Sequence, residues 1–215
     1  MNYVESIHPQ GSAAWLSERL GKVTGSKVDD IYATVKTGEA AARRNYRLQL
    51  ALERITGESE PVYVNDAMRR GTELEPFARS AYELHSGNLV SEVGFLSHPE
   101  MLAGTSPDGM IWNGTLLLGV FEAKCPGATK HLEYLDGHKV PSEYRKQCLH
   151  HLWITGAEWC DFVSFHPKFP EQLRLFCVRL QASEVQAELS EHAQKVAAFL
   201  AEIDDTVRQI MQRAA

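Results

Sequence analysis

The sequence predicts an α/β (α+β) domain in which helices flank a mixed central β-sheet. Apolar residues recur at helical spacing through much of the first 86 positions, and residues 89–123 then form apolar runs of strand length. Helical and strand-like segments alternate after that, so the order is helices, strands, helix, strands, helix. With 215 residues, 44% of them hydrophobic, we expect one domain over residues 1–215.

The helices of the first part are delimited by residues that typically begin and end helices. They are expected over residues 12–20, 39–57 and 71–86, with a short helix between the first two. Ser12 can accept a hydrogen bond from the first helical turn, and Gly57 and Gly87 suit the position just after a helix.

The strands and the remaining helices follow from changes in hydrophobic periodicity. Strands are expected over residues 89–96, 110–123, 159–165 and 173–180, and helices over residues 140–155 and 183–213. Asn113-Gly114, between two apolar runs, predicts a hairpin with a type I′ turn. The last helix is amphipathic, and we expect it to pack on its own domain.

Composition excludes several classes of protein. No apolar run approaches the ~20 residues that span a bilayer, so we expect a soluble cytoplasmic protein without membrane contact. The four cysteines are scattered, which argues against zinc and iron–sulfur sites. A net charge of −6 argues against a protein that coats DNA, because lysine and arginine supply most of that affinity.

One segment carries the residues for chemistry. Residues 115–121 lack charge and are apolar on both faces, which predicts a central strand covered on both sides. Glu122 and Lys124 follow it and project to one face, while Ala123 turns its side chain away and can offer its carbonyl. Asp108, in a Ser-Pro-Asp-Gly turn, lies at the mouth of the same hairpin.

Two carboxylates and a carbonyl are hard oxygen ligands, which favour Mg²⁺ or Mn²⁺ over zinc. In an ideal ladder Asp108 would lie about three residues, or ~10 Å, from Glu122, so we expect a bend or bulge near Pro107. Lys124 could then hold or deprotonate an attacking water, and a second metal ion could take the leaving oxygen. Taken separately, the turn and the Glu-x-Lys pair could be an ordinary surface turn and an ordinary salt bridge.

Further motifs stand in order along the chain. They are Trp15 with Arg-Leu-Gly-x-x-Thr-x-Ser at residues 19–26, Gly-x-x-x-Glu at 71–75, Ser-Pro-Asp-Gly at 106–109, Glu-x-Lys-Cys-Pro at 122–126, and Tyr-x-x-Gln at 144–147. This series resembles the PD-(D/E)xK nuclease superfamily, whose core is restriction-endonuclease-like, and within it the lambda-type exonucleases of phage recombination. The resemblance covers roughly residues 12–165.

The resemblance implies roles for individual residues. It makes Asp108, Glu122 and the Ala123 carbonyl ligands of Mg²⁺, with Mn²⁺ as a substitute and two ions in all, and it makes Lys124 the catalytic lysine. Glu75 becomes an acidic helper near the second ion or the attacking water. The residues implied in binding the 5′-phosphate or the DNA are Arg19, Ser26, Ser106, Gln147, Tyr144, Lys36 and Met68. His150 and His151 lack a ligand-spaced partner and are interpreted as helix-surface or core residues.

The implied activity is 5′-to-3′ digestion of linear double-stranded DNA, which releases 5′-mononucleotides and leaves a 3′ single strand for annealing. A homotrimeric ring around the DNA and a single-strand annealing recombinase as partner are also implied. Two alternatives stay open. An endonuclease of the same superfamily would cut closed circular DNA, and a DNA-binding scaffold would keep the fold without activity.

Overall fold

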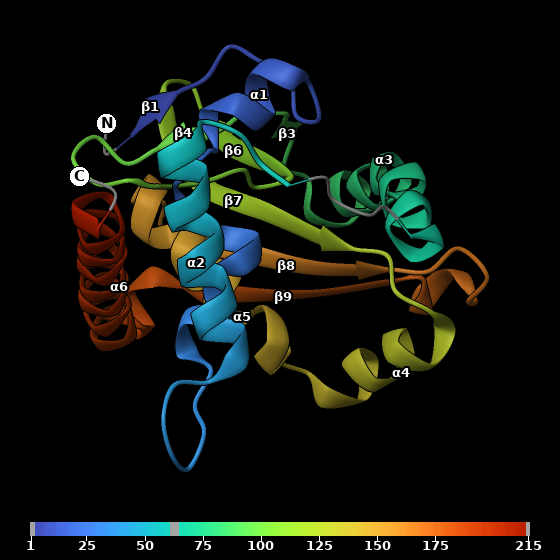
Figure 1. Cartoon of the computed structure of the whole chain (residues 1–215). Helices are drawn as coiled ribbons and strands as arrows, with labels where there is room; N and C mark the ends of the chain where they lie inside the picture. The colour runs from blue at the N-terminus through green and yellow to red at the C-terminus, as the bar shows by residue number, and fades with distance from the viewer. Residues whose placement is uncertain (1–2, 61–64, 214–215) are drawn as a thin grey trace.

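Two β-sheets form the centre of the fold (Figure 1). The computed structural model describes residues 3–60 and 65–213. The larger sheet has the strand order β3 (Val90–Ser91), β6 (Gly109–Asn113), β7 (Leu116–Lys124), β8 (Trp159–Phe165) and β9 (Leu175–Gln181). β7 and β8 are parallel and the other neighbours are antiparallel, so the sheet is mixed, as predicted.

The smaller sheet brings the N-terminal segment to the middle of the chain. Its order is β1 (Val4–Glu5), β4 (Leu96–Ser97), β5 (Ala103–Thr105) and β2 (Val23–Thr24). One strand was predicted over residues 89–96, and this is wrong, because β3 and β4 belong to different sheets. Gly94 lies between them, where a Cβ atom would be 2.7 Å from the carbonyl oxygen of His8. The close approach of the N-terminal segment thus separates the two strands.

The helices lie where the sequence predicts them, with two differences. They are α1 (Ala13–Glu18), the 3₁₀ helix η1 (Gly25–Tyr32), α2 (Ala41–Thr56), α3 (Asp66–Ser86), α4 (Ala128–Gly137), α5 (Ser142–Thr155), two short 3₁₀ turns η2 (Glu171–Leu173) and η3 (Ala182–Glu184), and α6 (Gln186–Arg213). α3 begins earlier than residue 71, because Asn65 accepts a hydrogen bond from Met68 N–H at 2.9 Å. The residues of its first turn are all exposed, Met68 included, so this turn shows no apolar periodicity.

Helix α4 was not predicted. It is short, and Leu132, one of its few apolar residues, is exposed. Contacts with distant segments hold it: buried His131 lies 2.7 Å from Ser164 Oγ and 2.8 Å from the carbonyl oxygen of Leu173, and Tyr134 packs in the core beside Phe162. Such contacts leave no periodic signal in the sequence.

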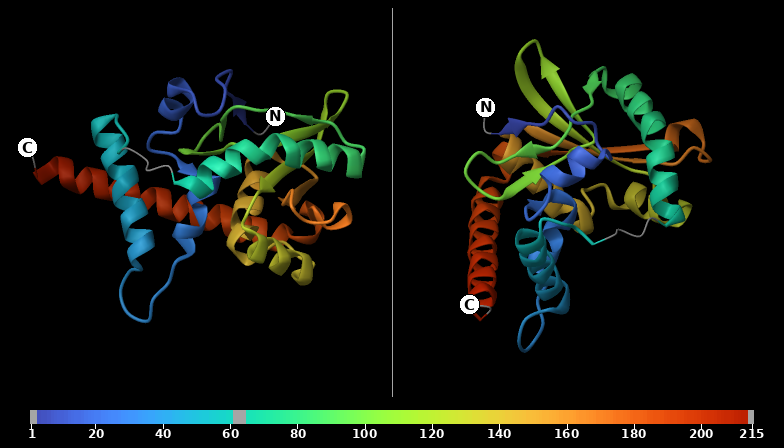
Figure 2. Two further views of the ribbon diagram at one scale, coloured as in Figure 1. Left: turned by 90° about the vertical axis from the view of Figure 1, so that its right-hand side faces the viewer. Right: turned by 45° about the horizontal axis from the view of Figure 1, so that its top comes forward.

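Alternation along the central strands divides the core into two layers. Val120 and Phe162 face α5, while Phe121 and Val163 face the layer that contains α3. α2 packs against η1 and α6, and α6 also packs against α5. α3 lies on the opposite side of the large sheet (Figure 2). Phe199 in α6 is fully buried, so the expected packing of the last helix on its own domain is confirmed. In the described residues no helix is long and apolar enough to cross a bilayer.

Two buried histidines, His150 in α5 and His192 in α6, lie next to each other in the core. His192 Nε2 lies 3.0 Å from His150 Nδ1, and Tyr32 Oη lies 2.7 Å from His192 Nδ1. Burial lowers the pKa of both histidines, and the charge of Lys146 adds to this at His192, whose pKa falls to about 4. Both rings are therefore neutral in the folded protein under mildly acidic conditions.

We expect the free energy of unfolding to fall as the pH drops. Unfolded histidine binds a proton below pH ~6.5 and folded His192 binds one only near pH ~4, so acid stabilises the unfolded chain by up to ~3 kcal/mol through His192 alone. Denaturant unfolding between pH 7.5 and 5 measures this loss. In His192→Gln the loss should be smaller, whereas a variant of exposed His85 should keep it; equal slopes in all three proteins would contradict the assignment.

Candidate active site

The β6–β7 hairpin sets Asp108 beside the end of strand β7. Asn113 pairs with Leu116, so Gly114 and Thr115 form the turn. Gly114 has φ 59°, but Thr115 has a negative φ, because His138 is the one non-glycine residue with positive φ in the described part of the chain. A type I′ turn needs positive φ at both central residues, so that prediction is wrong, and the geometry fits type II′. Because the turn lies at Gly114-Thr115 and not at Asn113-Gly114, the strand pairing is displaced by two residues from the ideal ladder.

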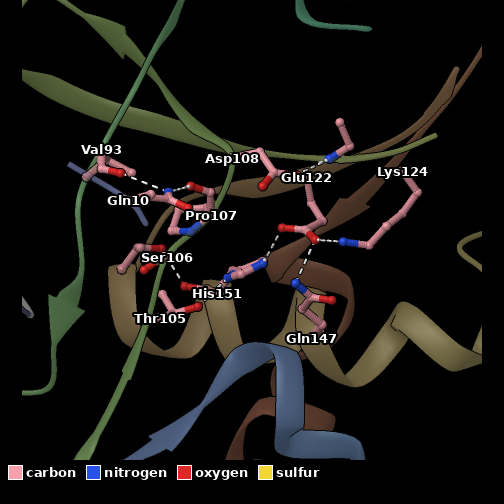
Figure 3. Close-up of polar contacts among 12 residues, drawn as sticks. Gln10, Val93, Thr105, Ser106, Pro107, Asp108, Glu122, Lys124, Gln147 and His151 are labelled. Atoms are coloured by element: carbon pink, nitrogen blue, oxygen red, sulfur yellow. Dashed lines mark hydrogen bonds and ion pairs between the residues drawn. The ribbon is translucent and has the colours of Figure 1, made fainter. Parts of the chain in front are cut away.

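A bulge adds the third residue of displacement. Trp112 pairs with Leu117 but Ile111 pairs with Gly119, which leaves Leu118 as the extra residue on β7. The bend was expected near Pro107, and it lies further along the hairpin. Gly109 consequently pairs with Phe121, and Asp108 Oδ2 accepts a hydrogen bond of 2.8 Å from the backbone N–H of Ala123 (Figure 3).

Three donors surround the carboxylate of Glu122, which is 1% exposed. Lys124 reaches back along the strand and pairs with Oε1, as their common face predicts. Gln147 Nε2 donates to the same oxygen at 2.6 Å, and His151 Nε2 lies 2.8 Å from Oε2 (Figure 3). The ammonium of Lys124 also lies 5.2 Å from the centre of the Tyr144 ring.

The charges in this cluster shift one another. Burial and then the charge of Glu122 raise the pKa of Asp108 well above its usual value. Burial also raises the pKa of Glu75. The charge of Arg79 lowers this pKa in part, and the charge of Glu122 raises it further. At Glu122 itself burial is outweighed by Lys124 and His151, so its pKa falls below the usual range. Burial lowers the pKa of Lys124, but the charges of Glu122 and Asp108 raise it by more. Its pKa therefore lies above the usual value, and the ammonium stays protonated.

The donor set fits a hard divalent cation. Burial and, to a smaller extent, the charge of Glu122 disfavour the ionised forms of Asp108 and Glu75, and a bound cation would favour those forms. The N–H and C=O groups of one strand residue point to the same side, so the Ala123 carbonyl faces the Asp108 side. Within residues 3–60 and 65–213 no three His, Cys, Asp or Glu side chains already form a metal cage. The carbonyl of Ala123 would complete the ligand set.

Arg19 and Ser106 form a second group of polar side chains. Ser106 Oγ accepts hydrogen bonds from Arg19 Nη1 at 3.3 Å and from Trp15 Nε1 at 3.0 Å. The guanidinium lies 4.1 Å from the centre of the Trp15 ring, and burial lowers its pKa. Ser106 directly follows β5 and is two residues from Asp108, so this group adjoins the carboxylates in the chain.

The other residues predicted to bind DNA are not drawn into that group. Gln147 donates to Glu122 instead, because α5 runs beside the end of β7. Ser26 is exposed at the start of η1. Lys36 is exposed in the loop between η1 and α2, at the bottom of Figure 1, and Met68 is exposed in the first turns of α3.

A cleft of ≈ 690 Å³ opens beside Asp108. The N-terminal segment and α3 line it, and Glu75, Arg79 and Trp15 contribute side chains. Arg79 pairs with Glu92 and lies 3.5 Å from Glu75. Both carboxylates of the sequence motifs, Asp108 and Glu75, are thus reached from one opening.

Sequence reasoning missed several residues that hold the site together. Gln10 Nε2 donates to the carbonyl oxygens of Val93 and Pro107, both at 2.9 Å, and so fastens the turn that carries Asp108. His151 was interpreted as a surface or core residue; it is buried, and it contacts Glu122. The available signal was its position four residues after Gln147, on the same face of α5.

The fold and the arrangement of Asp108, Glu122 and Lys124 define a member of the PD-(D/E)xK nuclease superfamily, as the sequence motifs indicated. A model of the YqaJ-like viral recombinase domain matches residues 14–158. The chain belongs to this family.

Solved structures support the same conclusion. The alkaline exonuclease LHK-Exo from Laribacter hongkongensis is 38% identical, with 94% of this chain and 98% of that chain covered; its TM-score is 0.83, and 0.84 for its complex with dAMP. A phage-related exonuclease from Haemophilus somnus 129PT shares the fold at 14% identity, with 88% of this chain and 96% of that chain covered and a TM-score of 0.64. No curated protein sequence matches significantly.

Proposed function

We propose that this chain is a Mg²⁺-dependent exonuclease that digests linear double-stranded DNA from the 5′ end and leaves a 3′ single strand. A nuclease acting on DNA agrees with the family and with the exonucleases named above. One observation carries the finer proposal: Asp108, Glu122 and Lys124 converge at the end of β7, and Ser106, which accepts a hydrogen bond from Arg19, is two residues from Asp108.

The carboxylates and the lysine divide the chemistry. Asp108, Glu122 and the Ala123 carbonyl would hold the divalent ion, which would stabilise charge on the phosphate and lower the pKa of a bound water. Mn²⁺ can replace Mg²⁺ because both take oxygen ligands, and Glu75 lies where it can assist a second ion. Lys124, protonated in this environment, orients the attacking water and offsets negative charge on the phosphate.

In the proposed step the water oxygen attacks phosphorus and the bond from phosphorus to the 3′ oxygen breaks. The 3′ oxygen takes a proton and leaves on the released nucleotide, which keeps its own 5′-phosphate. The shortened strand then carries a new 5′-phosphate, so the same substrate group is regenerated at every cycle.

Polarity comes from the Arg19–Ser106 pair. A guanidinium and a hydroxyl are good donors to the oxygens of a terminal phosphate, and Arg19 is already oriented by Trp15. We propose Ser26 and Gln147 as further donors, with Tyr144 flanking Lys124 and with Lys36 and Met68 contacting DNA beyond the cut. Digestion of end-labelled duplexes, described at the end of the Discussion, tests this function.

Assembly into a ring reconciles the acidic chain with a polyanionic substrate. A net charge of −6 opposes binding of DNA by a monomer, and a closed ring can turn its basic residues inward. Arg43 is neutralised by Glu39 and Glu202, whereas Lys36 and Arg44 are exposed. We propose a homotrimer that encloses DNA and passes its product strand to a single-strand annealing recombinase.

The ring makes a direct prediction about mass. Light scattering in moderate salt should give about three times the monomer mass of 24.1 kDa at micromolar concentration. A monomer mass that persists with DNA present would exclude enclosure as the source of tight binding.

A further inference from the structure

Three buried side chains form a hydrogen-bonded series that ends on Glu122. Thr105 Oγ1 lies 2.6 Å from His151 Nδ1, and His151 Nε2 lies 2.8 Å from Glu122 Oε2. Thr105 is fully buried, and His151 and Glu122 are each 1% exposed. The series runs from the end of β5 through α5 to β7, so it joins both sheets of the protein (Figure 3).

The chemistry of each group fixes the direction of the bonds. An ionised carboxylate can only accept, so His151 Nε2 carries the hydrogen and donates it to Glu122. In a neutral ring the other nitrogen is then an acceptor, and Thr105 Oγ1–H donates to it. His151 is thereby held in one ring orientation, by Thr105 at Nδ1 and by Glu122 at Nε2.

The neighbouring backbone is shaped to admit this series. A Cβ atom on Gly25 would lie 2.7 Å from Thr105 Oγ1 and 3.4 Å from His151 Cε1. Glycine at this position therefore leaves room for the hydroxyl and the ring in their observed places. Gly25 is needed here for space and not for its backbone conformation, because its φ is not in the left-handed region.

The result of these bonds is a carboxylate fixed at both oxygens. Lys124 and Gln147 hold Oε1, and His151 holds Oε2. If His151 lost its donor, Oε2 would be a buried acceptor without a partner, and the carboxylate would be held at Oε1 alone. Groups that orient a metal-binding carboxylate in this way typically change metal affinity or activity by about 10- to 100-fold when removed.

We propose that His151 is a positioning residue of the nuclease site, whose Nε2–H fixes Glu122 in the orientation that binds the divalent ion. This inference rests on the proposed function. In this role His151 touches neither the DNA nor the reacting atoms, and it acts through its hydrogen bond to Glu122. His150, the preceding residue, belongs to the separate series with His192 and Tyr32 and has no such role.

The choice of substitutions separates positioning from folding. Glutamine can place its amide N–H near the position of His Nε2, whereas asparagine reaches only the position of Nδ1. His151→Gln should therefore keep kcat and Mn²⁺ affinity within about fivefold of the unmodified protein. We expect His151→Asn and His151→Leu to lose about 10- to 100-fold in both quantities, with KM for DNA unchanged within about twofold.

The experiment combines two readouts on the full chain. Calorimetric titration of Mn²⁺ alone gives affinity without DNA, steady-state digestion gives kcat and KM, and thermal unfolding checks each variant. His150→Gln is the matched control: we expect lower stability, with Mn²⁺ affinity retained. Equal Mn²⁺ affinity and kcat for the glutamine and asparagine variants would overturn the positioning role, even if the leucine variant fails to fold. If the unmodified protein binds Mn²⁺ but does not cut DNA, the proposed function fails instead.

Discussion

Replacing Asp108, Glu122 or Lys124 should abolish DNA cleavage while the protein stays folded. In Asp108→Asn, Glu122→Gln and Lys124→Met the site loses a ligand or a cation that stabilises charge on the phosphate. Several kcal/mol of transition-state stabilisation correspond to at least ~10³-fold in rate, since each ~1.4 kcal/mol is tenfold. Initial rates on a linear duplex with saturating Mg²⁺ measure the loss. Retention of more than a few per cent of the rate by one variant would remove that residue from the catalytic set.

The Asp108 and Lys124 variants should change stability in opposite directions, which separates catalytic from structural roles. Burial and the charge of Glu122 raise the pKa of Asp108, so ionised Asp108 destabilises the metal-free fold above its unfolded pKa. Asp108→Asn removes that charge but can still accept from Ala123 N–H. We therefore expect this variant to unfold at a higher temperature than the unmodified protein in EDTA at pH 8. Lys124→Met leaves Glu122 without its cation and should unfold at a lower temperature.

A matched control guards against a general effect of lost charge. Asp136→Asn, on an exposed turn of α4, removes one carboxylate outside the site. Its cleavage rate and unfolding temperature should match those of the unmodified protein. A comparable loss of rate in this control would mean that net charge, and not the Asp108–Glu122–Lys124 cluster, governs the reaction.

Replacement of Arg19 should remove the preference for a 5′-phosphate. Arg19→Met keeps an unbranched side chain against Trp15 but loses the guanidinium, which we propose as the main donor to the terminal phosphate. A hydrogen bond to a charged group contributes ~1.5 to 3 kcal/mol, so digestion of 5′-phosphorylated ends should slow by about 10- to 100-fold. Digestion of 5′-hydroxyl ends should change by less than about threefold.

The ratio of the two rates within one variant is the internal control for misfolding. Exposed Arg69 offers a second control, because Arg69→Ala also removes one positive charge. We expect that variant to affect both kinds of end equally. If Arg19→Met slows both ends by the same factor, Arg19 has a structural or general DNA-binding role.

The central strand and its polar end could be predicted because local patterns determine them. An uncharged run followed by Glu-x-Lys predicts a buried strand whose last residues need partners, and β7 ends at Lys124 with Glu122 paired. Strand β8 was predicted with its exact bounds, since five of its seven residues are aromatic, β-branched or cysteine, even though Asp161 and Ser164 interrupt them. Asp108 was also expected to lie near Glu122. The ideal ladder would have placed it about three residues away, and the observed register of β6 and β7 removes that offset.

The remaining features depend on contacts between distant segments. The register of the hairpin follows from a turn at Gly114 and a bulge at Leu118, which composition alone does not reveal. α4 is held by contacts of His131 and Tyr134 with distant segments, and His151 reaches Glu122 only because α5 packs beside β7. A histidine without a ligand-spaced neighbour gives no sign of such a role in the sequence.

Digestion of four DNA substrates side by side tests the proposed function most directly. They are a linear duplex with 5′-phosphates, the same duplex with 5′-hydroxyl ends, a 3′-labelled duplex and a closed circle, each with Mg²⁺ or with EDTA. We predict that the phosphorylated duplex is digested fastest, that the 3′-labelled strand is shortened from its 5′ end, and that the closed circle and all EDTA reactions stay intact. Cutting of the closed circle, shortening from the 3′ end, or full activity in EDTA would contradict a metal-dependent 5′-to-3′ exonuclease.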